Sequence, residues 1–283
     1  MIKKRRFRPP LFVYKRIFSV YNGGMKTKAY AKINLTLDVF EKTDGLHLLD
    51  TVIAPVDLSD DVEVNFFEDK GVTCTMDGVL QDETNSAVKA AKIMIEEYDL
   101  PGADVTIQKG IPLSAGLGGS TADGVAVFRI YSDVFGVKVT RSMLKKLGSD
   151  AAAMWQNRIC RAEGTGGIVT PVKIEVPYKI GLVVAEGGVS TAECYAAFDE
   201  NPGKRRRFTE NLLAKKVFDV RALGNDLEDA ATALNPNIKE AINRLYLAGA
   251  KKAVMTGSGS GVVGYFEKDA YLPEDVTELK ILY

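Results

Sequence analysis

The sequence predicts a two-domain α+β protein, and three observations support this fold class. The length of 283 residues suits roughly two domains. Segments with the spacing of strands and segments with the spacing of helices follow one another in mixed order. The pattern breaks near residues 172–178, so we expect one domain over residues 25–172 and a second over residues 173–283.

The first predicted domain opens with two strands. Apolar residues alternate with polar ones at 33–39 and again at 62–66, which is the period of a half-buried strand. Asn85 is a candidate helix cap, because apolar residues follow it at helical spacing. We expect a short strand at 105–107 and a further helix that begins near Ser120, after a glycine-rich loop.

The second predicted domain begins with a strand at 180–185. The spacing of apolar residues then predicts helices near 209–216, 224–234 and 237–248. Two more strands, expected at 253–255 and 262–266, flank a short segment rich in glycine and serine.

The composition excludes several classes of protein. The 37 Lys and Arg residues balance 37 Asp and Glu residues, which argues against a nucleic-acid-binding protein with a dominant basic surface. No apolar run approaches the ~18 residues that a membrane-spanning helix needs. The three cysteines lie far apart and His47 is the single histidine, so we expect neither a zinc site nor a disulfide framework. We therefore expect a cytoplasmic protein, monomer or homodimer, without nucleic-acid or membrane partners.

Residues 1–24 differ in composition from the rest of the chain, since they contain seven Lys or Arg residues and no acidic residue. A transit-like leader, or a basic tail that contacts membrane or nucleic acid, has this composition. Met25 follows Tyr-Asn-Gly-Gly and opens a regular strand pattern. We therefore favour a disordered extension, or a start assigned upstream of the true one at Met25.

The strongest local signal is the segment Pro112-Leu-Ser-Ala-Gly-Leu-Gly-Gly-Ser-Thr-Ala122. Its glycines let the backbone approach a ligand closely, and the helix start after them presents unpaired N–H groups to an anion. This predicts a phosphate site, at which the Ser120 and Thr121 hydroxyls can bind phosphate or Mg²⁺. The alternative is a strand end followed by a capping Ser120. No lysine follows the last glycine, so the segment is not a P-loop.

A second glycine-rich segment, 257–261, has two interpretations. It is either a further loop at the same site or a tight hairpin. Residues 259–264 match GxGxxG, but a strand follows them and too few residues remain for a βαβ unit, which excludes a dinucleotide site.

Segment 112–122 resembles the signature loop of the GHMP small-molecule kinases. Seven further segments extend the resemblance, in the order of the family, over residues 25–268: 31–35, 43–47, 148–150, 162–164, 170–172, 225–228 and 255–260. The resemblance implies an ATP-binding domain of the ribosomal S5 type and a ferredoxin-like second domain, with a cleft between them.

The resemblance also implies the chemistry. The segments are most similar to those of members that phosphorylate the 2-hydroxyl of 4-diphosphocytidyl-2-C-methyl-D-erythritol for non-mevalonate isoprenoid synthesis, with ATP and Mg²⁺. Asp150 corresponds to the family's catalytic aspartate and Lys32 to the lysine paired with it. An aspartate can accept the hydroxyl proton, and a lysine can stabilise the developing charge. No carboxylate is assigned to the metal, although the Ser120 hydroxyl is a candidate ligand.

The ATP contacts implied by the resemblance lie mostly in the glycine-rich segment: Pro112, Ala115, Gly116, Leu117, Gly118, Gly119, Ser120, Thr121 and Ala122, with Lys109 and Asn85 on the adenine side. A surface lysine and a plain helix cap are the alternatives for the last two.

Three residues correspond to the family's substrate site. The resemblance implies that Asn34 lies on the substrate side, that His47 reads the cytosine edge and that Tyr195 stacks on the base. A structural histidine and a tyrosine buried in the domain core are the alternatives.

The sequence departs from the family at three places. Leu46 replaces a tyrosine that stacks on cytosine, residues 151–153 are alanines instead of Val-Pro-Phe, and Gly167 replaces a glutamate. These changes remove a stacking surface and bulky support beside the catalytic carboxylate. Two alternative functions follow: a GHMP kinase for another small alcohol, or a nucleotide-binding protein with little kinase activity.

Overall fold

The computed structural model describes residues 24–203 and 206–283. The expectations for residues 1–23 lie outside this range. The described chain forms two compact units that exchange segments: residues 24–30, Ser59–Gly110 and Gly119–Ala151 form the first, and Ala31–Leu58, Ile111–Gly118 and Ala152–Tyr283 the second. The sequence instead predicts a single division of the chain, near residue 172. That domain boundary stays a prediction, because the compact units are built from interleaved segments.

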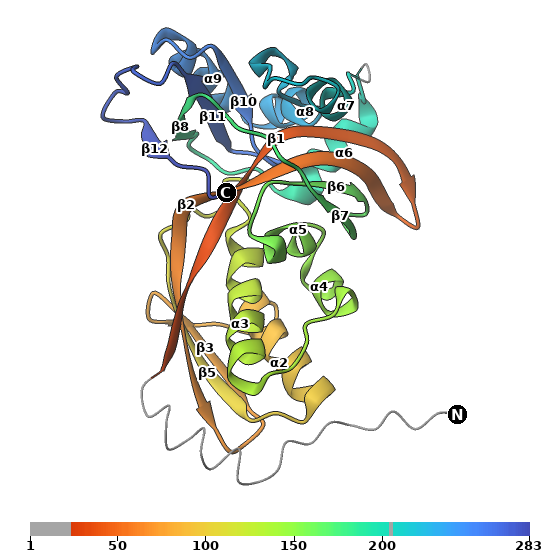
Figure 1. Ribbon diagram of the computed structural model, residues 1–283, viewed down its shortest axis with the longest axis vertical. Helices are drawn as coiled ribbons and strands as arrows, with labels where there is room; N and C mark the ends of the chain where they lie inside the picture. Colours follow the sequence, from red (N-terminus) through yellow and green to blue (C-terminus); the bar gives the residue numbers. More distant parts are fainter. Residues whose placement is uncertain (1–23, 204–205) are drawn as a thin grey trace. The chain divides into compact units, whose positions relative to one another are not determined.

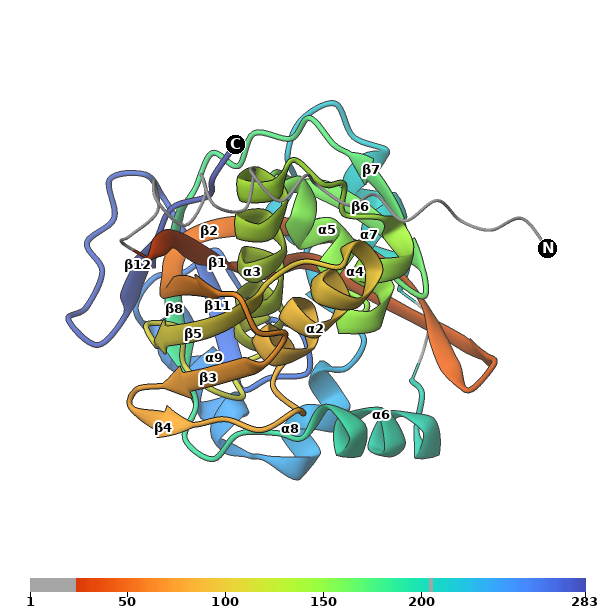
Figure 2. The same cartoon turned by 90° about the horizontal axis from the view of Figure 1, so that it is seen from below.

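The first unit combines a sheet with helices. It contains the start of β1 (Met25–Thr43), the later part of β2 (Leu46–Phe67), β3 (Val72–Met76), β4 (Val79–Leu80), α2 (Ser86–Tyr98), β5 (Gly102–Gln108), α3 (Gly119–Phe135) and α4 (Arg141–Leu147). β5 pairs antiparallel with β2 and parallel with β3, and Figure 2 shows β3 between β4 and β5. Helices α2 and α3 lie side by side, and α2 contacts β3 and β5 (Figure 1). The strands predicted at 62–66 and 105–107 and the helices predicted after Asn85 and near Ser120 are confirmed, as is the strand at 33–39, which is the part of β1 in the second unit.

Helix α2 shows why this region folds as predicted. The Asn85 side chain accepts a hydrogen bond of 2.8 Å from the Ala87 N–H, so the predicted cap is confirmed. The apolar face of the helix, which includes Val88 and Met94, is buried. Gly124 of α3 lets the two helices approach, because a Cβ there would lie 2.9 Å from the Ser86 carbonyl oxygen.

The second unit holds the remaining strands and helices. They are β6 (Cys160–Gly164), β7 (Ile168–Pro171), β8 (Lys179–Val184), α6 (Thr191–Glu200), α7 (Phe208–Leu213), a 3₁₀ turn (Val220–Ala222), β9 (Gly224–Asn225), α8 (Glu228–Leu234), α9 (Asn237–Leu247), β10 (Lys252–Met255), β11 (Gly261–Phe266) and β12 (Thr277–Leu279). Helix α5 (Ala151–Gln156) begins on the last residue of the first unit.

The second unit has an antiparallel sheet in the order β10-β11-β8-β12. Helix α9 packs on this sheet through its apolar face, in which Ile238 and Leu245 are fully buried. The earlier part of β2 pairs with β6, and β6 pairs with β7. The segment 224–234 was expected to be one helix, but its first residues differ.

Gly224 and Asn225 form strand β9, parallel to β1, and helix α8 begins only at Glu228. A Cβ at Gly224 would lie 2.1 Å from a ring atom of Phe208, so the chain passes too close for a side chain. The prediction of a helix from residue 224 is therefore wrong at its start, because tertiary contacts hold these two residues extended.

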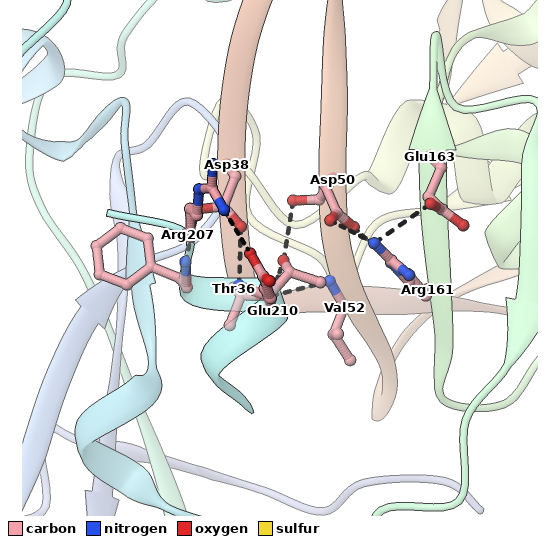
Figure 3. Close-up of polar contacts among 10 residues, drawn as sticks. Thr36, Asp38, Asp50, Val52, Arg161, Glu163, Arg207 and Glu210 are labelled. Atoms are coloured by element: carbon pink, nitrogen blue, oxygen red, sulfur yellow. Dashed lines mark hydrogen bonds and ion pairs between the residues drawn. The ribbon is translucent and has the colours of Figure 1, made fainter. Parts of the chain in front are cut away.

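A buried polar cluster attaches α7 to β1 and β2 within the second unit (Figure 3). The Asp38 carboxylate accepts hydrogen bonds from the N–H groups of Phe208, at 2.7 Å, and Thr209, at 2.8 Å. The Thr209 hydroxyl meets the Thr36 hydroxyl at 2.7 Å and also donates to the Asp50 carbonyl oxygen. These partners explain how a carboxylate with 2% exposure is tolerated.

Candidate active site

The first glycine-rich loop leads directly into α3, which begins at Gly119 as predicted. Gly116 and Gly118 adopt positive φ angles of 69° and 73°, which glycine adopts without strain. Ala115 and Leu117 are buried, so their side chains face inward and only their backbone is available to a ligand. The first N–H groups of α3 have no partner within the helix, which suits an anion.

The second glycine-rich segment packs against the first. The Ser260 N–H donates to the Ser114 carbonyl at 3.0 Å, and the Gly261 N–H donates to the Ala115 carbonyl at 3.1 Å. A Cβ at Gly116 would lie 2.0 Å from the Thr256 carbonyl oxygen. Because residues 257–261 also join the antiparallel strands β10 and β11, the hairpin and the second loop are one structure.

Lys32 lies on β1 beside the first loop. Its N–H donates to the Leu117 carbonyl at 2.9 Å, and a Cβ at Gly118 would lie 3.1 Å from Lys32 Cγ. The side chain is nearly buried, and its Nζ donates to Asn34 Oδ1 at 2.6 Å. The lysine is thereby held in one position next to the glycine-rich backbone.

Asn34 connects Lys32 to the second loop. Besides Lys32, its Oδ1 accepts a hydrogen bond from the Gly257 N–H at 3.0 Å, and its Nδ2 donates to the Thr51 hydroxyl at 2.8 Å. Its own N–H donates to the Thr256 hydroxyl at 3.0 Å. Thr51 and Thr256 were missed as site residues, although Thr256 lies inside a segment that carried the family resemblance.

The segment 225–228 supports the second loop from behind. Asn225 Nδ2 donates to the carbonyls of Met255, at 2.9 Å, and Gly257, at 2.8 Å. The Glu228 carboxylate accepts from the Met255 N–H at 2.9 Å. Burial raises the pKa of Glu228, and the hydrogen bond from Met255 opposes this effect. These two side chains hold the second loop in place.

Lys109 lies in the first unit between two buried carboxylates. Its Nζ donates to Asp60 and, at 3.0 Å, to Asp123 of α3, while Asp60 also accepts from the Gly110 N–H at 2.8 Å. The lysine side chain is only 9% exposed, so the interpretation as a surface lysine is wrong. Neither carboxylate was identified from the sequence, because Asp60 is 49 residues away from Lys109.

The charges of Lys109, Asp60 and Asp123 affect one another. Burial raises the pKa of Asp123 to about 7, against the attraction of Lys109 and with the repulsion of Asp60. Burial lowers the pKa of Lys109, but the charges and hydrogen bonds of Asp123 and Asp60 outweigh it and raise that pKa. Asp123 Oδ1 is buried without a hydrogen-bond partner among the described residues.

Ser120 and Thr121 lie at the start of α3 in the first unit. The Ser120 hydroxyl meets the Ser86 hydroxyl at 2.9 Å, which brings the beginnings of α2 and α3 together. A Cβ at Gly148 would lie 3.7 Å from the Thr121 hydroxyl. The chain just before Asp150 therefore passes next to the start of α3.

His47 and Tyr195 meet in the second unit. Their rings stack with centroids 5.1 Å apart and planes 24° apart, and Phe198 contacts the imidazole edge-on. His47 Nδ1 lies 2.6 Å from the Phe40 carbonyl oxygen. Tyr195 is half-buried against the core of this unit, so the structure brings these two predicted substrate residues together.

The three departures from the family have different surroundings. Leu46 is 56% exposed, so its side chain makes little contact with the protein. No atom lies within 4 Å of a Cβ built at Gly167, so a glutamate fits there. Ala153 is buried in a small apolar cluster with Ile53 and Cys160. Helix α5 is therefore packed against its neighbours even though this side chain is short.

Two kinds of feature are absent from residues 24–203 and 206–283. This part of the chain contains no cluster of three or more His, Cys, Asp or Glu side chains that could hold a metal ion. None of its helices is long and apolar enough to cross a membrane.

Comparisons with known proteins agree with this geometry. Residues 85–167 match the model of the GHMP kinase N-terminal domain, and residues 209–281 match that of the GHMP kinase C-terminal domain. The 4-diphosphocytidyl-2-C-methyl-D-erythritol kinase of Clostridium botulinum (strain Eklund 17B / Type B) is 36% identical over 258 residues, which cover 86% of this chain and 91% of that protein. The enzyme of the same name from Bacteroides fragilis (strain ATCC 25285) is 32% identical over 257 residues, with coverages of 87% and 93%.

A solved structure extends the comparison to three dimensions. The crystal structure of a 4-(cytidine 5'-diphospho)-2C-methyl-D-erythritol kinase matches with a TM-score of 0.71 and 28% identity. The match covers 85% of this chain and 90% of that one.

Proposed function

Because the chain belongs to the GHMP kinase family and has the two-domain fold of that family, we propose that it transfers the γ-phosphoryl group of ATP to the 2-hydroxyl of 4-diphosphocytidyl-2-C-methyl-D-erythritol. Relatives at 31–36% identity carry the name of this kinase, over at least 84% of the present chain. The reaction belongs to the synthesis of isoprenoid precursors.

The observation that carries the proposal is the junction of the two glycine-rich loops with Lys32 and Asn34. Close backbone contact between the loops needs glycine at 116, and Lys32 lies against Gly118 while Asn34 holds its ammonium. A backbone cradle with a fixed ammonium beside it suits a triphosphate whose charge must be stabilised during transfer. The further ATP contacts in 112–122, and those of Asn85 and Lys109, belong to this proposal. For Lys109 the contact is indirect, because its ammonium is already bound by two carboxylates.

Two residues carry the chemistry in this proposal. Asp150 accepts the proton of the 2-hydroxyl, whose oxygen then forms a bond to the γ-phosphorus while the bond from that phosphorus to the leaving ADP oxygen breaks. Lys32 stabilises the charge on the transferred group. The passage of Gly148 beside Thr121 supports a place for Asp150 near the triphosphate.

Mg²⁺ is part of the proposal, and the residues present fit it. Magnesium commonly keeps several waters and binds substrate phosphates with only one or two protein ligands. The Ser120 hydroxyl, exposed at the start of α3, is such a ligand. The metal would neutralise phosphate charge when bound.

The acceptor side of the proposal consists of His47, Tyr195 and Asn34. Tyr195 supplies an aromatic face for the cytosine, and His47, which stacks with Tyr195, lies at the edge of the base. Asn34 acts chiefly by positioning Lys32, since both ends of its amide are bound. We place the enzyme in the cytoplasm, because the three cysteines are free and buried.

The test is release of ADP from ATP and Mg²⁺ by the full chain, with and without the acceptor. We expect release that depends on 4-diphosphocytidyl-2-C-methyl-D-erythritol and falls at least 10³-fold in Asp150→Asn, on the scale of a lost general base. Full turnover in Asp150→Asn would overturn the assigned role.

The exposed Leu46 favours one second candidate, a kinase for another alcohol acceptor. A panel of sugar and polyol acceptors distinguishes the two candidates. Turnover of another acceptor in place of the cytidine compound would replace the proposed substrate.

A further inference from the structure

The two ring nitrogens of His47 lie against different groups of the protein. A carbonyl oxygen only accepts, so the Nδ1 atom, 2.6 Å from the Phe40 oxygen, carries a hydrogen. Nε2 is buried and has no hydrogen-bond partner in the described part of the chain. It lies 3.0 Å from Asp199 Oδ1, which is ion-pair distance. Nε2 is thus enclosed against the Asp199 carboxylate.

Helix α6 surrounds this imidazole on three sides. Tyr195, Phe198 and Asp199 follow one another at helical spacing, so they share the face of α6 that meets His47. Tyr195 covers a face of the ring, Phe198 its edge, and Asp199 lies beside Nε2. The imidazole is only 9% exposed, which fixes its orientation.

Asp199 is an acceptor that remains reachable. Its Oδ2 is bound by Lys42, and the side chain is 35% exposed. The hydrogen bond from Lys42 lowers the pKa of Asp199, and the charges of His47 and Lys42 act in the same direction. The group is therefore an ionised carboxylate, which accepts hydrogen bonds and donates none.

We propose that Asp199 is a base-reading residue of the acceptor site. It accepts a hydrogen bond from the exocyclic 4-amino group of cytosine, next to the stacked rings of His47 and Tyr195. This inference rests on the proposed function and adds a residue that the family resemblance did not supply. A carboxylate that accepts from the cytosine amine is a recurrent pairing in base recognition.

The Asp199 carboxylate favours cytosine over uracil. Uracil has a carbonyl oxygen where cytosine has the amine, so two acceptors would face each other at Asp199 without a hydrogen between them. An asparagine at the same position has an N–H₂ group that can donate to that carbonyl. Discrimination between the two bases therefore depends on the charge and not only on the shape of residue 199.

The experiment compares kcat/KM for the cytidine acceptor with that for its uridine analogue in the wild type and in Asp199→Asn. We expect the ratio to fall at least tenfold in the variant, through a higher KM for the cytidine compound. Binding of CMP and UMP to the ATP-free enzyme, measured by calorimetry, should show the same loss of preference. A melting curve like that of the wild type excludes misfolding as the cause.

Two variants separate base reading from a structural role of Asp199. Glu200→Gln changes the next carboxylate on α6, and Lys42→Met removes the other partner of Asp199; both should keep the ratio within twofold of the wild type. An equal loss for both acceptors in Asp199→Asn, or the same fall of the ratio in Lys42→Met, would overturn the inference. If the wild type turned over neither acceptor, the proposed function itself would fail, which is a distinguishable result.

Discussion

Single residues in this protein act mainly through partners that are remote in the sequence. Asn34 illustrates this, because its amide contacts Lys32, Thr51 and Gly257 at once. A substitution there would disturb the lysine before it disturbed any substrate contact. The same principle applies to the carboxylates around Lys109.

The raised pKa of Asp123 leads to a prediction about pH. The folded protein binds a proton at Asp123 up to about pH 7, whereas the unfolded chain loses it near the ordinary value of 3.8. The folded state therefore binds more protons in this window, and Asp123 lowers stability as pH rises through it. In Asp123→Asn this contribution is absent. The free energy of unfolding of the variant, relative to the wild type, should thus rise between pH 5 and pH 7, by at most about 1.4 kcal/mol per pH unit.

Urea denaturation at pH 5, 6, 7 and 8 measures this difference. Asp269→Asn, at an exposed position, is the control and should follow the wild type at every pH. A difference between Asp123→Asn and the wild type that stays constant from pH 5 to pH 8 would contradict the assigned titration.

At the level of elements, the junction of the two glycine-rich loops is the most constrained feature. Gly116 combines a positive φ with a would-be Cβ only 2.0 Å from the Thr256 carbonyl oxygen. Gly116→Ala should lower the free energy of unfolding by about 2 kcal/mol or more, from backbone strain and overpacking together. The loops should also separate, so ATP affinity should fall at least tenfold.

Calorimetric titration with ATP and chemical denaturation test both effects. Gly167→Ala is the matched control, since no atom lies within 4 Å of its would-be Cβ and its φ is not in the left-handed region. Wild-type affinity in Gly116→Ala would show that close contact between the loops is not needed.

The elements also show what a sequence pattern can and cannot predict. Strands β1 and β8 and helices α2 and α9 were predicted because their apolar spacing is regular. Helix α6 was missed, although Ser190 and Glu193 have the spacing of a capping box. The start of the 224–234 segment was mispredicted, because contacts with Phe208 and the second loop override local propensity.

For the candidate site, the motifs identified the loops and Lys32, but not the side chains that hold them. Asp60 and Asp199 have no local signal, since 49 residues separate Asp60 from Lys109 and 152 separate Asp199 from His47. Only the fold brings such pairs together.

On the scale of the whole molecule, the reactivity of the three cysteines shows whether the protein is folded. Cys74, Cys160 and Cys194 each have no exposed surface, and they come from both compact units. Burial raises the pKa of Cys74 to about 12 and that of Cys194 to about 11, so neither forms the reactive thiolate at neutral pH.

We therefore expect no thiol of the native protein to react with Ellman's reagent at pH 8, and all three to react in denaturant. Intact-mass measurement after alkylation locates any exception. A thiol that reacts at once in the native state would mean that one of the units opens locally.

The distance in sequence between the two glycine-rich loops has a consequence for biosynthesis. Residues 114–118 leave the ribosome long before residues 256–261, which form the backing of the first loop within the same compact unit. Such non-local contacts form slowly, because a long stretch of chain must be closed before they contribute. A nascent chain thus carries the first glycine-rich loop without its backing while about half of the chain is still being made, and the junction of the two loops forms only after residue 261 has been added.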